Sequence, residues 1–219
     1  MRRARRVSIA LLMVMAAGAR AEVIDRVAAA AGQQVVTLSA IRRALRLQAV
    51  FDLREYEDTP AERRKAADRL IDQAIVLREI GLSRYAGATM AEADALLGGF
   101  GKDRGMTGEQ LAAALERYGF SEDDFRQEML WRVTVQRFVD FRFMPGVQVS
   151  DGEVQAYYEQ EFVPALRAAD GKAVAPAVEE VRERITQVLT TRKTNAALEQ
   201  WLKQARETLK VRFFEEAFR

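Results

Sequence analysis

Glycine and lysine occur together in the segment GGFGKDRG (98–105), a combination that is typical of loops that bind phosphate groups. Such a loop follows a strand and leads into a helix N-terminus, where backbone amides hold the anion. The residues before Gly98 follow a helical pattern instead, and the glycine spacing matches neither a P-loop nor a dinucleotide fingerprint. We therefore interpret the segment as a turn between two helices.

Paired carboxylates are the second candidate for chemistry, since two converging acids can perform general acid–base catalysis or bind a metal ion. The pairs are Asp123-Asp124, Glu179-Glu180 and Glu215-Glu216. Adjacent side chains on a helix point about 100° apart, so these carboxylates do not converge on one atom. We interpret them as capping or solvated residues.

The chain contains no histidine and no cysteine. This composition excludes an imidazole base, a thiolate nucleophile, disulfides, and zinc sites built from Cys and His. Carboxylate metal sites in helical bundles also draw on histidine. The sequence therefore predicts no catalytic residue, no metal and no cofactor.

Aromatic and methionine side chains near helix ends are the remaining candidates, and their chemistry is the binding of apolar peptides. At helical spacing such residues more often belong to a core. Methionine and phenylalanine exposed near helix ends would instead suit loose and promiscuous contacts. The candidate peptide-binding residues are Met90, Phe100, Met106, Phe141, Phe143, Met144 and Tyr157.

Residues 1–21 have the pattern of a secretory signal peptide. Four arginines precede an apolar run over 7–17, and Ala19-Arg20-Ala21 supplies small residues for cleavage after Ala21. The run is short for a bilayer span, so an N-terminal membrane anchor is the weaker alternative. The segment holds five Arg and no acid, which leaves 29 basic and 32 acidic residues in the rest of the chain. We expect an exported, periplasmic protein with no nucleic-acid partner and no stable membrane insertion.

Helix-capping signals recur along the chain and predict a mainly α fold. They begin at Thr59, Thr89, Thr107, Ser121 and Ser150, and Ser39 is expected to cap an earlier helix. The helix from Pro60 to about Leu82 is expected to bury Ala67, Leu70, Ala74, Leu77 and Ile80. The helix after Ser121 is apolar nearly all round its axis, so it is expected to be central.

The two ends of the chain predict a small β element, formed by a hairpin over 22–38 and a strand within 209–218. Ala, Gly and Pro over 164–176 predict a linker before the last long helix, which begins after Pro176. The polar segment TTRKTN (190–195) interrupts the apolar face of that helix. It predicts a bend or a change of packing partner there.

The order of these segments resembles the SurA-type periplasmic chaperones. GKDRGMTGEQLAAALERYGFSEDDFRQEMLWRVTVQRFV (101–139) and VSDGEVQAYYEQEF (149–162) are similar to successive helices of that family's N-terminal domain. VIDRVAAAAGQQVVTLSAI (23–41) and RITQVLTTRKTNAALEQWLKQARETLKVRF (184–213) are similar to its opening hairpin and its C-terminal helix and strand. The resemblance implies a SurA N-terminal-like helical domain over 22–163, on which residues 177–219 pack back.

The family's parvulin domains, which carry prolyl isomerase activity, lie between the Tyr-Tyr helix and the C-terminal helix. Only residues 164–176 occupy that position here, and parvulin sites use histidine, which this chain lacks. The resemblance therefore implies a non-enzymatic, ATP-independent chaperone that binds unfolded or partly folded proteins, among them outer-membrane protein precursors. An adaptor or assembly module with one dedicated periplasmic partner stays open as an alternative, as does a homodimer through the C-terminal helix. A prolyl isomerase is the least favoured alternative.

Overall fold

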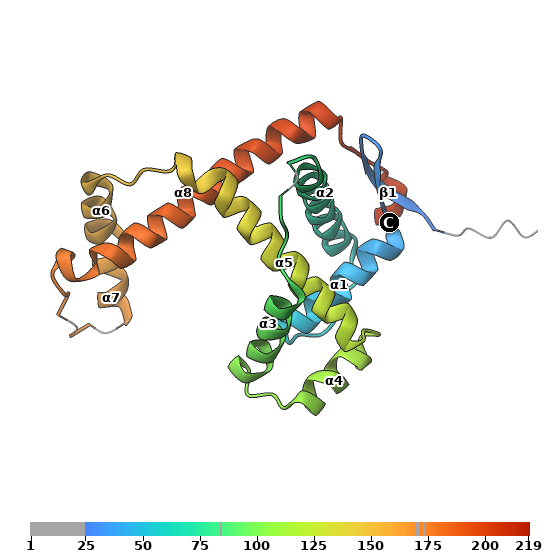
Figure 1. The fold of residues 1–219 in the computed structure, drawn as a ribbon, viewed down its shortest axis with the longest axis horizontal. Helices are drawn as coiled ribbons and strands as arrows, with labels where there is room; N and C mark the ends of the chain where they lie inside the picture. The colour runs from blue at the N-terminus through green and yellow to red at the C-terminus, as the bar shows by residue number, and fades with distance from the viewer. Residues whose placement is uncertain (1–24, 84, 170, 173) are drawn as a thin grey trace, which may run out of the picture.

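A computed structural model describes residues 25–83, 85–169, 171–172 and 174–219, and it confirms a mainly α fold with a small β element (Figure 1). The predicted signal peptide and its cleavage site lie outside the described residues. Among the helices of the described part, none is both long enough and apolar enough to cross a membrane. The helices are α1 (Leu38–Asp52), α2 (Pro60–Ser83), α3 (Met90–Asp103), α4 (Gly108–Arg117), α5 (Glu122–Phe143), α6 (Asp151–Tyr157), α7 (Val163–Ala169) and α8 (Val178–Leu209). The shorter elements are β1 (Val27–Ala31), β2 (Gln34–Thr37), β3 (Arg212–Phe213), η1 (Met144–Gly146), η2 (Tyr158–Phe162) and η3 (Glu215–Phe218).

The β element joins the two ends of the described chain in one antiparallel sheet of order β2-β1-β3. Ala29 of β1 pairs with Phe213 of β3, which confirms that the C-terminal segment adds to the hairpin. The strand is much shorter than the predicted range of 209–218. Lys210 has a positive φ of 51° that ends α8, and only the two residues opposite β1 pair before η3 begins.

Local capping chemistry starts the helices where the sequence predicted. Reciprocal capping boxes are present at Thr89, Thr107, Ser121 and Ser150, and the Thr59 hydroxyl accepts from the Glu62 amide at 3.2 Å. The cap of α1 was predicted wrongly. Thr37 caps that helix, because its Oγ1 accepts from the Ala40 amide, whereas the Ser39 hydroxyl donates to Asp25.

Most of the glycine-rich segment 98–105 is helical. The prediction of a turn over the whole segment was therefore wrong. α3 runs through Gly98, Gly99 and Gly101 to Asp103, and the turn follows at residues 104–106. Gly101 is buried, and a Cβ there would meet the Met106 carbonyl oxygen at 3.4 Å. A side chain at Gly101 would therefore make an ordinary van der Waals contact with the returning chain.

Two hydrophobic cores stabilise the body of the molecule. The first joins the β element to α1, α2 and the end of α8, and the second joins α3, α4 and the start of α5 to the end of α1. α5 contacts α2, α3, α4 and α8, which confirms its central place (Figure 1). The buried face of α2 was predicted wrongly in part, because Ile71, Ile75 and Val76 are buried while Leu77 is 57% exposed.

An arm made of α6, η2 and α7 lies against the first half of α8 and extends away from the body (Figure 1). α8 then crosses α5 and reaches α2, which confirms the predicted change of partner around residues 190–195. The predicted linker is partly helical, since α7 covers residues 163–169. Pro164 is tolerated because the preceding η2 is a wide π-turn, in which the Val163 amide donates to the Tyr158 carbonyl.

Candidate peptide-binding surface

Exposed apolar side chains gather where the end of α2 meets the end of α5. The Tyr85 ring lies 5.8 Å from that of Phe138 and 5.5 Å from that of Phe141, measured between centroids. Phe138 is buried, but Phe141 and Leu82 are each 68% exposed. Met144, one helical turn after Phe141, is 42% exposed. We call Leu82, Tyr85, Phe141 and Met144 the α2–α5 patch.

Polar contacts hold the chain around Tyr85 against α5. Arg142 pairs with Glu79 at 2.8 Å, and the Thr134 hydroxyl accepts from the Ala88 amide at 3.0 Å. The Glu92 carboxylate accepts from both Thr89 and Arg137. Its pKa is lowered, first by the Thr89 backbone hydrogen bond and further by Arg137. These contacts join α2 and the segment before α3 to α5 on either side of the patch.

A groove between α1, α2 and α5 is the second apolar surface. It has a volume of about 320 Å³. Ala40, Ala44 and Leu47 of α1 line it together with Ala66 and Leu70 of α2. Alanine side chains let another backbone approach closely, so this three-helix groove suits an inserted helix or extended segment.

The rim of the three-helix groove is charged and polar. Arg43 pairs with Asp124 at 2.7 Å, and Arg132 pairs with Glu128 at 2.9 Å. Both pairs are partly exposed, so they contribute little to the stability of the fold. They surround the apolar lining with both signs of charge, as in the polar rim of a protein interface.

The structure separates the predicted peptide-binding residues. Phe141 and Met144 lie on the α2–α5 patch, and Met90 at the start of α3 is 40% exposed. Phe143 packs on Trp201 of α8, with ring centroids 5.8 Å apart. The ring of Tyr157 on the arm lies 4.9 Å from the guanidinium carbon of Arg192. These residues therefore form several small surfaces rather than one.

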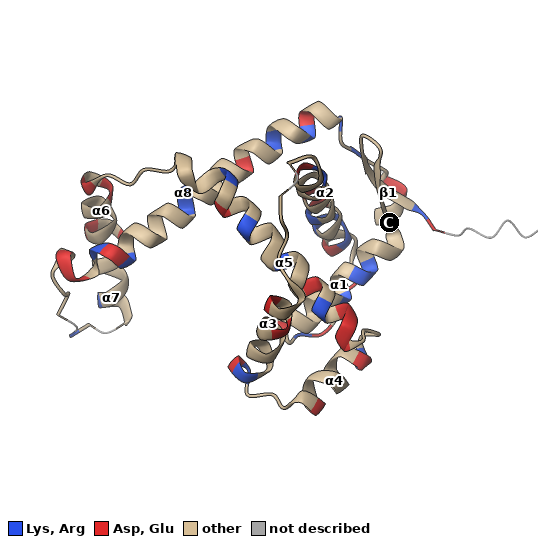
Figure 2. Ribbon diagram, viewed as in Figure 1, with Lys and Arg blue, Asp and Glu red and all other residues tan. Residues whose placement is uncertain are grey.

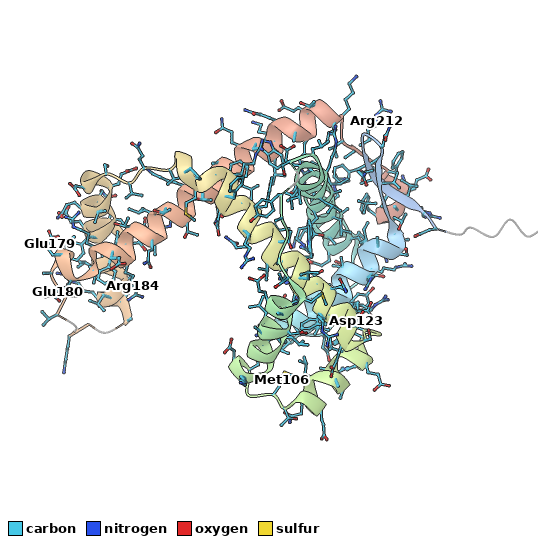
Figure 3. The ribbon with its side chains drawn as sticks, in the orientation of Figure 1. Met106, Asp123, Glu179, Glu180, Arg184 and Arg212 are labelled. Carbon is cyan, nitrogen blue, oxygen red and sulfur yellow. The ribbon has the colours of Figure 1, made fainter. Side chains whose placement is uncertain are left out.

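Phe100 is not available on the surface, which corrects the sequence-based expectation. It is 7% exposed and lies 5.5 Å from the Phe51 ring and 5.1 Å from the Phe125 ring, measured between centroids. Met106 is half-buried against the same core, in the connection between α3 and α4 (Figure 3). The sequence shows that Phe100 lies near a helix end. It does not show that Phe51 of α1 and Phe125 of α5 cover the ring.

Sequence reasoning missed Leu77, Leu82 and Tyr85. Leu77 was placed on the buried face of α2, but the helix contacts its neighbours along the Ile71–Ile75 side. The positions of Leu82 and Tyr85 could have indicated exposure, because both lie near the end of α2. Apolar residues there often lie beyond the last helix that packs against the element. The three-helix groove gave no signal, because three separate segments form it.

Several of the carboxylates in the predicted acidic pairs form ion pairs with arginines. Asp123 and Asp124 pair with Arg126 and Arg43 respectively, and Glu179 pairs with Arg182. Asp123 lies at the start of α5, whereas Glu179 and Glu180 lie in the first turn of α8, beside the arm (Figure 3). Basic and acidic residues alternate along α5 and α8 (Figure 2). In the described part of the chain, no cluster of three or more acids could hold a metal ion.

Comparisons with known proteins give one informative similarity. No family model matches the chain. The chain is 28% identical over 192 residues to chaperone SurA from Alkalilimnicola ehrlichii. The match covers 82% of this chain but 44% of that protein, so the chain corresponds to less than half the length of this relative. The similarity supports a SurA-like relationship.

Proposed function

We propose that this protein is an ATP-independent periplasmic chaperone that holds unfolded exported chains, including outer-membrane protein precursors. The observation that carries the proposal is the similarity to chaperone SurA over 82% of the chain. Several exposed apolar surfaces on a mixed-charge molecule fit this role, because weak contacts at separate places suit clients of varied sequence. Binding the unfolded state lowers the concentration of chain free to aggregate, and it needs no energy source.

The α2–α5 patch is the client surface that the geometry favours. Met144 is a flexible apolar contact, whereas Tyr85 and Phe141 are rigid ones. Phe141 is 68% exposed, more than Phe214 at 46%. A client segment with apolar side chains would bury Phe141 together with the neighbouring Tyr85.

The experiment is dilution of a urea-unfolded outer-membrane protein into buffer with and without the protein. We expect an equimolar amount to suppress light scattering without ATP. Lysozyme at the same concentration is the control for nonspecific effects. Unchanged scattering across the accessible range of protein concentrations would exclude the chaperone function.

An adaptor with one dedicated partner is the second candidate function, and the three-helix groove favours it. A compact groove with an apolar lining and charged rim matches one folded ligand better than many unfolded ones. Affinity capture from a periplasmic extract separates the two functions. One stoichiometric partner with no effect on client scattering would support the adaptor, whereas a mixture of unfolded exported proteins would support the chaperone. A homodimer through α8 would be seen by light scattering coupled to size exclusion.

Prolyl isomerase activity is not part of the proposal. The chain lacks histidine, and no sequence feature supplies another isomerase site. A proline-limited refolding assay measures this activity directly. If the protein accelerates the proline-limited slow phase of refolding, the proposal that it lacks isomerase activity is overturned.

A further inference from the structure

An open cavity of about 620 Å³ lies where the hairpin base, α1, the start of α2 and the C-terminal segment meet. We call it the arginine cavity, because arginine dominates its lining. The charged lining residues are Arg26, Arg42, Arg46, Arg63, Arg219 and Asp25. Five guanidinium groups therefore face one carboxylate in the lining.

The fold brings these arginines together from distant parts of the chain. Arg42 and Arg46 are one turn apart on α1, so their side chains leave the same face of the helix. Arg63 comes from the first turn of α2, and Arg26 is held by a hydrogen bond of 3.0 Å to the Glu216 carbonyl. Like charges one turn apart repel each other, so this arrangement is unfavourable without an anion nearby.

The carboxylates of the described residues neutralise only part of this charge. Asp58, next to the cavity, accepts from Arg42 Nε at 3.0 Å and from Arg63 Nε at 2.5 Å. Asp25 instead accepts hydrogen bonds from the Ser39 hydroxyl and amide. Arg63 also donates to the Arg219 main-chain oxygen at 2.9 Å and to the Asp58 carbonyl at 3.3 Å. Among the described residues, the five lining arginines still outnumber these two carboxylates.

Arg46 has a buried hydrogen-bond donor without an acceptor in the described part of the chain. Its Nε atom is buried and has no hydrogen-bond partner among the described residues. A buried donor on a cation without an acceptor is costly, so such an atom calls for an acceptor such as an ordered water, an anion or a partner group. The arginine cavity thus combines excess positive charge with an unused buried donor.

We propose that the arginine cavity is a binding site for a phosphate group. Guanidinium groups match phosphate oxygens with paired hydrogen bonds, and several of them can share one anion. A phosphate monoester carries nearly two negative charges and three acceptor oxygens, so it satisfies this excess of arginines better than a single carboxylate. The phosphate could belong to a free ion or to a lipid headgroup.

The first test is titration calorimetry of the full chain with inorganic phosphate and pyrophosphate at low ionic strength. We expect saturable binding of pyrophosphate. Arg46→Gln should weaken it about tenfold, since it removes a charged hydrogen-bond donor. Arg43→Gln is the matched control on the same helix, because Arg43 lines the three-helix groove and not this cavity. Its affinity for pyrophosphate should stay unchanged.

A second measurement does not depend on the folding of the variant. Pyrophosphate should raise the Tm of the unaltered chain, whereas sodium chloride of the same ionic strength should not, because only a ligand of the folded state stabilises it. Absence of saturable binding and of a Tm shift would overturn the proposal. Equal loss of affinity in Arg46→Gln and Arg43→Gln would also overturn it.

Vesicle flotation distinguishes the two sources of phosphate. Vesicles of phosphatidylcholine with phosphatidic acid present a phosphate monoester, and pure phosphatidylcholine vesicles are the control. The site would be a headgroup site if the protein floats with the phosphatidic acid vesicles, if pyrophosphate prevents this flotation, and if Arg46→Gln abolishes it. Pyrophosphate binding without flotation would identify a soluble phosphate ligand, and binding of duplex DNA alone would overturn the proposal. Client suppression is a separate readout, so failure here leaves the proposed chaperone function untouched.

Discussion

Glu153 Oε1 and Lys193 Nζ lie 2.5 Å apart, and this ion pair joins the first turn of α6 to the middle of α8. The same glutamate accepts from the Ser150 amide at 2.8 Å, while the lysine also donates to the Gln148 carbonyl at 2.6 Å. One carboxylate therefore both starts a helix and ties the arm to α8. Two further ion pairs, Arg182 with Asp151 and Arg192 with Glu161, also join the arm to α8.

The attachment of the arm should weaken in acid. The pKa of Glu153 is lowered to about 2, first by the Lys193 ammonium and then by the Ser150 hydrogen bonds. Because this folded-state value lies below the ordinary 4.5, the carboxylate stabilises the arm above about pH 4.5, and this contribution is lost as the pH falls toward 2. An NMR titration of the Glu153 carboxyl carbon should show the lowered midpoint.

Glu153→Gln separates the cap from the charge. Glutamine can still accept at this position of a capping box, so α6 should form while the ion pair is lost. We expect faster amide exchange in α6 at neutral pH and a weaker acid dependence of the arm. Glu159→Gln is the control, since Glu159 accepts from Gln155 within the arm itself. Identical behaviour of Glu153→Gln and the wild type would contradict this role of the ion pair.

Thr194→Val should stabilise the protein by about 1 kcal/mol, because it replaces a buried hydroxyl that lacks a partner by a methyl group of similar size. Thr194 is 3% exposed, and its Oγ1 has no hydrogen-bond partner among the described residues. Urea denaturation measures the free energy of unfolding. Thr191→Val is the control, since its exposed hydroxyl donates to the Gln187 carbonyl at 2.9 Å. A destabilised Thr194→Val variant would show that the hydroxyl has a partner in solution.

Arg206→Lys should lower the free energy of unfolding by about 1–2 kcal/mol, because lysine cannot reproduce three hydrogen bonds from one planar group. Arg206 of α8 donates to Asp72 at 2.7 Å, to the Asp68 carboxylate at 2.9 Å and to the Asp68 carbonyl at 2.9 Å. Equilibrium urea denaturation tests this clamp between α8 and α2. Arg184→Lys is the control, because Arg184 is exposed and lies near the start of α8 (Figure 3). This substitution should leave the free energy of unfolding unchanged.

Phe141→Ala should weaken client binding about fivefold, because we expect this aromatic contact to contribute about 1 kcal/mol to binding. The side chain is 68% exposed, so the free energy of unfolding should change little. Fluorescence anisotropy of a labelled unfolded client measures the affinity. Phe214→Ala is the control at an exposed phenylalanine next to β3. Equal affinities for Phe141→Ala and the wild type would remove the α2–α5 patch from the proposed client surface.

The sequence by itself determined the local features of this protein. A Ser or Thr three residues before an acid or amide makes its capping hydrogen bonds within one turn, so the starts of α3, α4, α5 and α6 were predictable. The absence of His and Cys likewise excluded whole classes of chemistry without any structure. These properties depend on composition or on neighbours along the chain.

Only the tertiary structure decided which apolar side chains remain exposed. Phe100 and Phe141 both lie toward the end of a helix, yet rings from α1 and α5 cover the first, while the second extends beyond the neighbours of α5. The arginine cavity likewise needs the hairpin, two helices and the C-terminal segment to meet. Burial and charge density depend on contacts between residues far apart in the chain, and a local pattern does not contain those contacts.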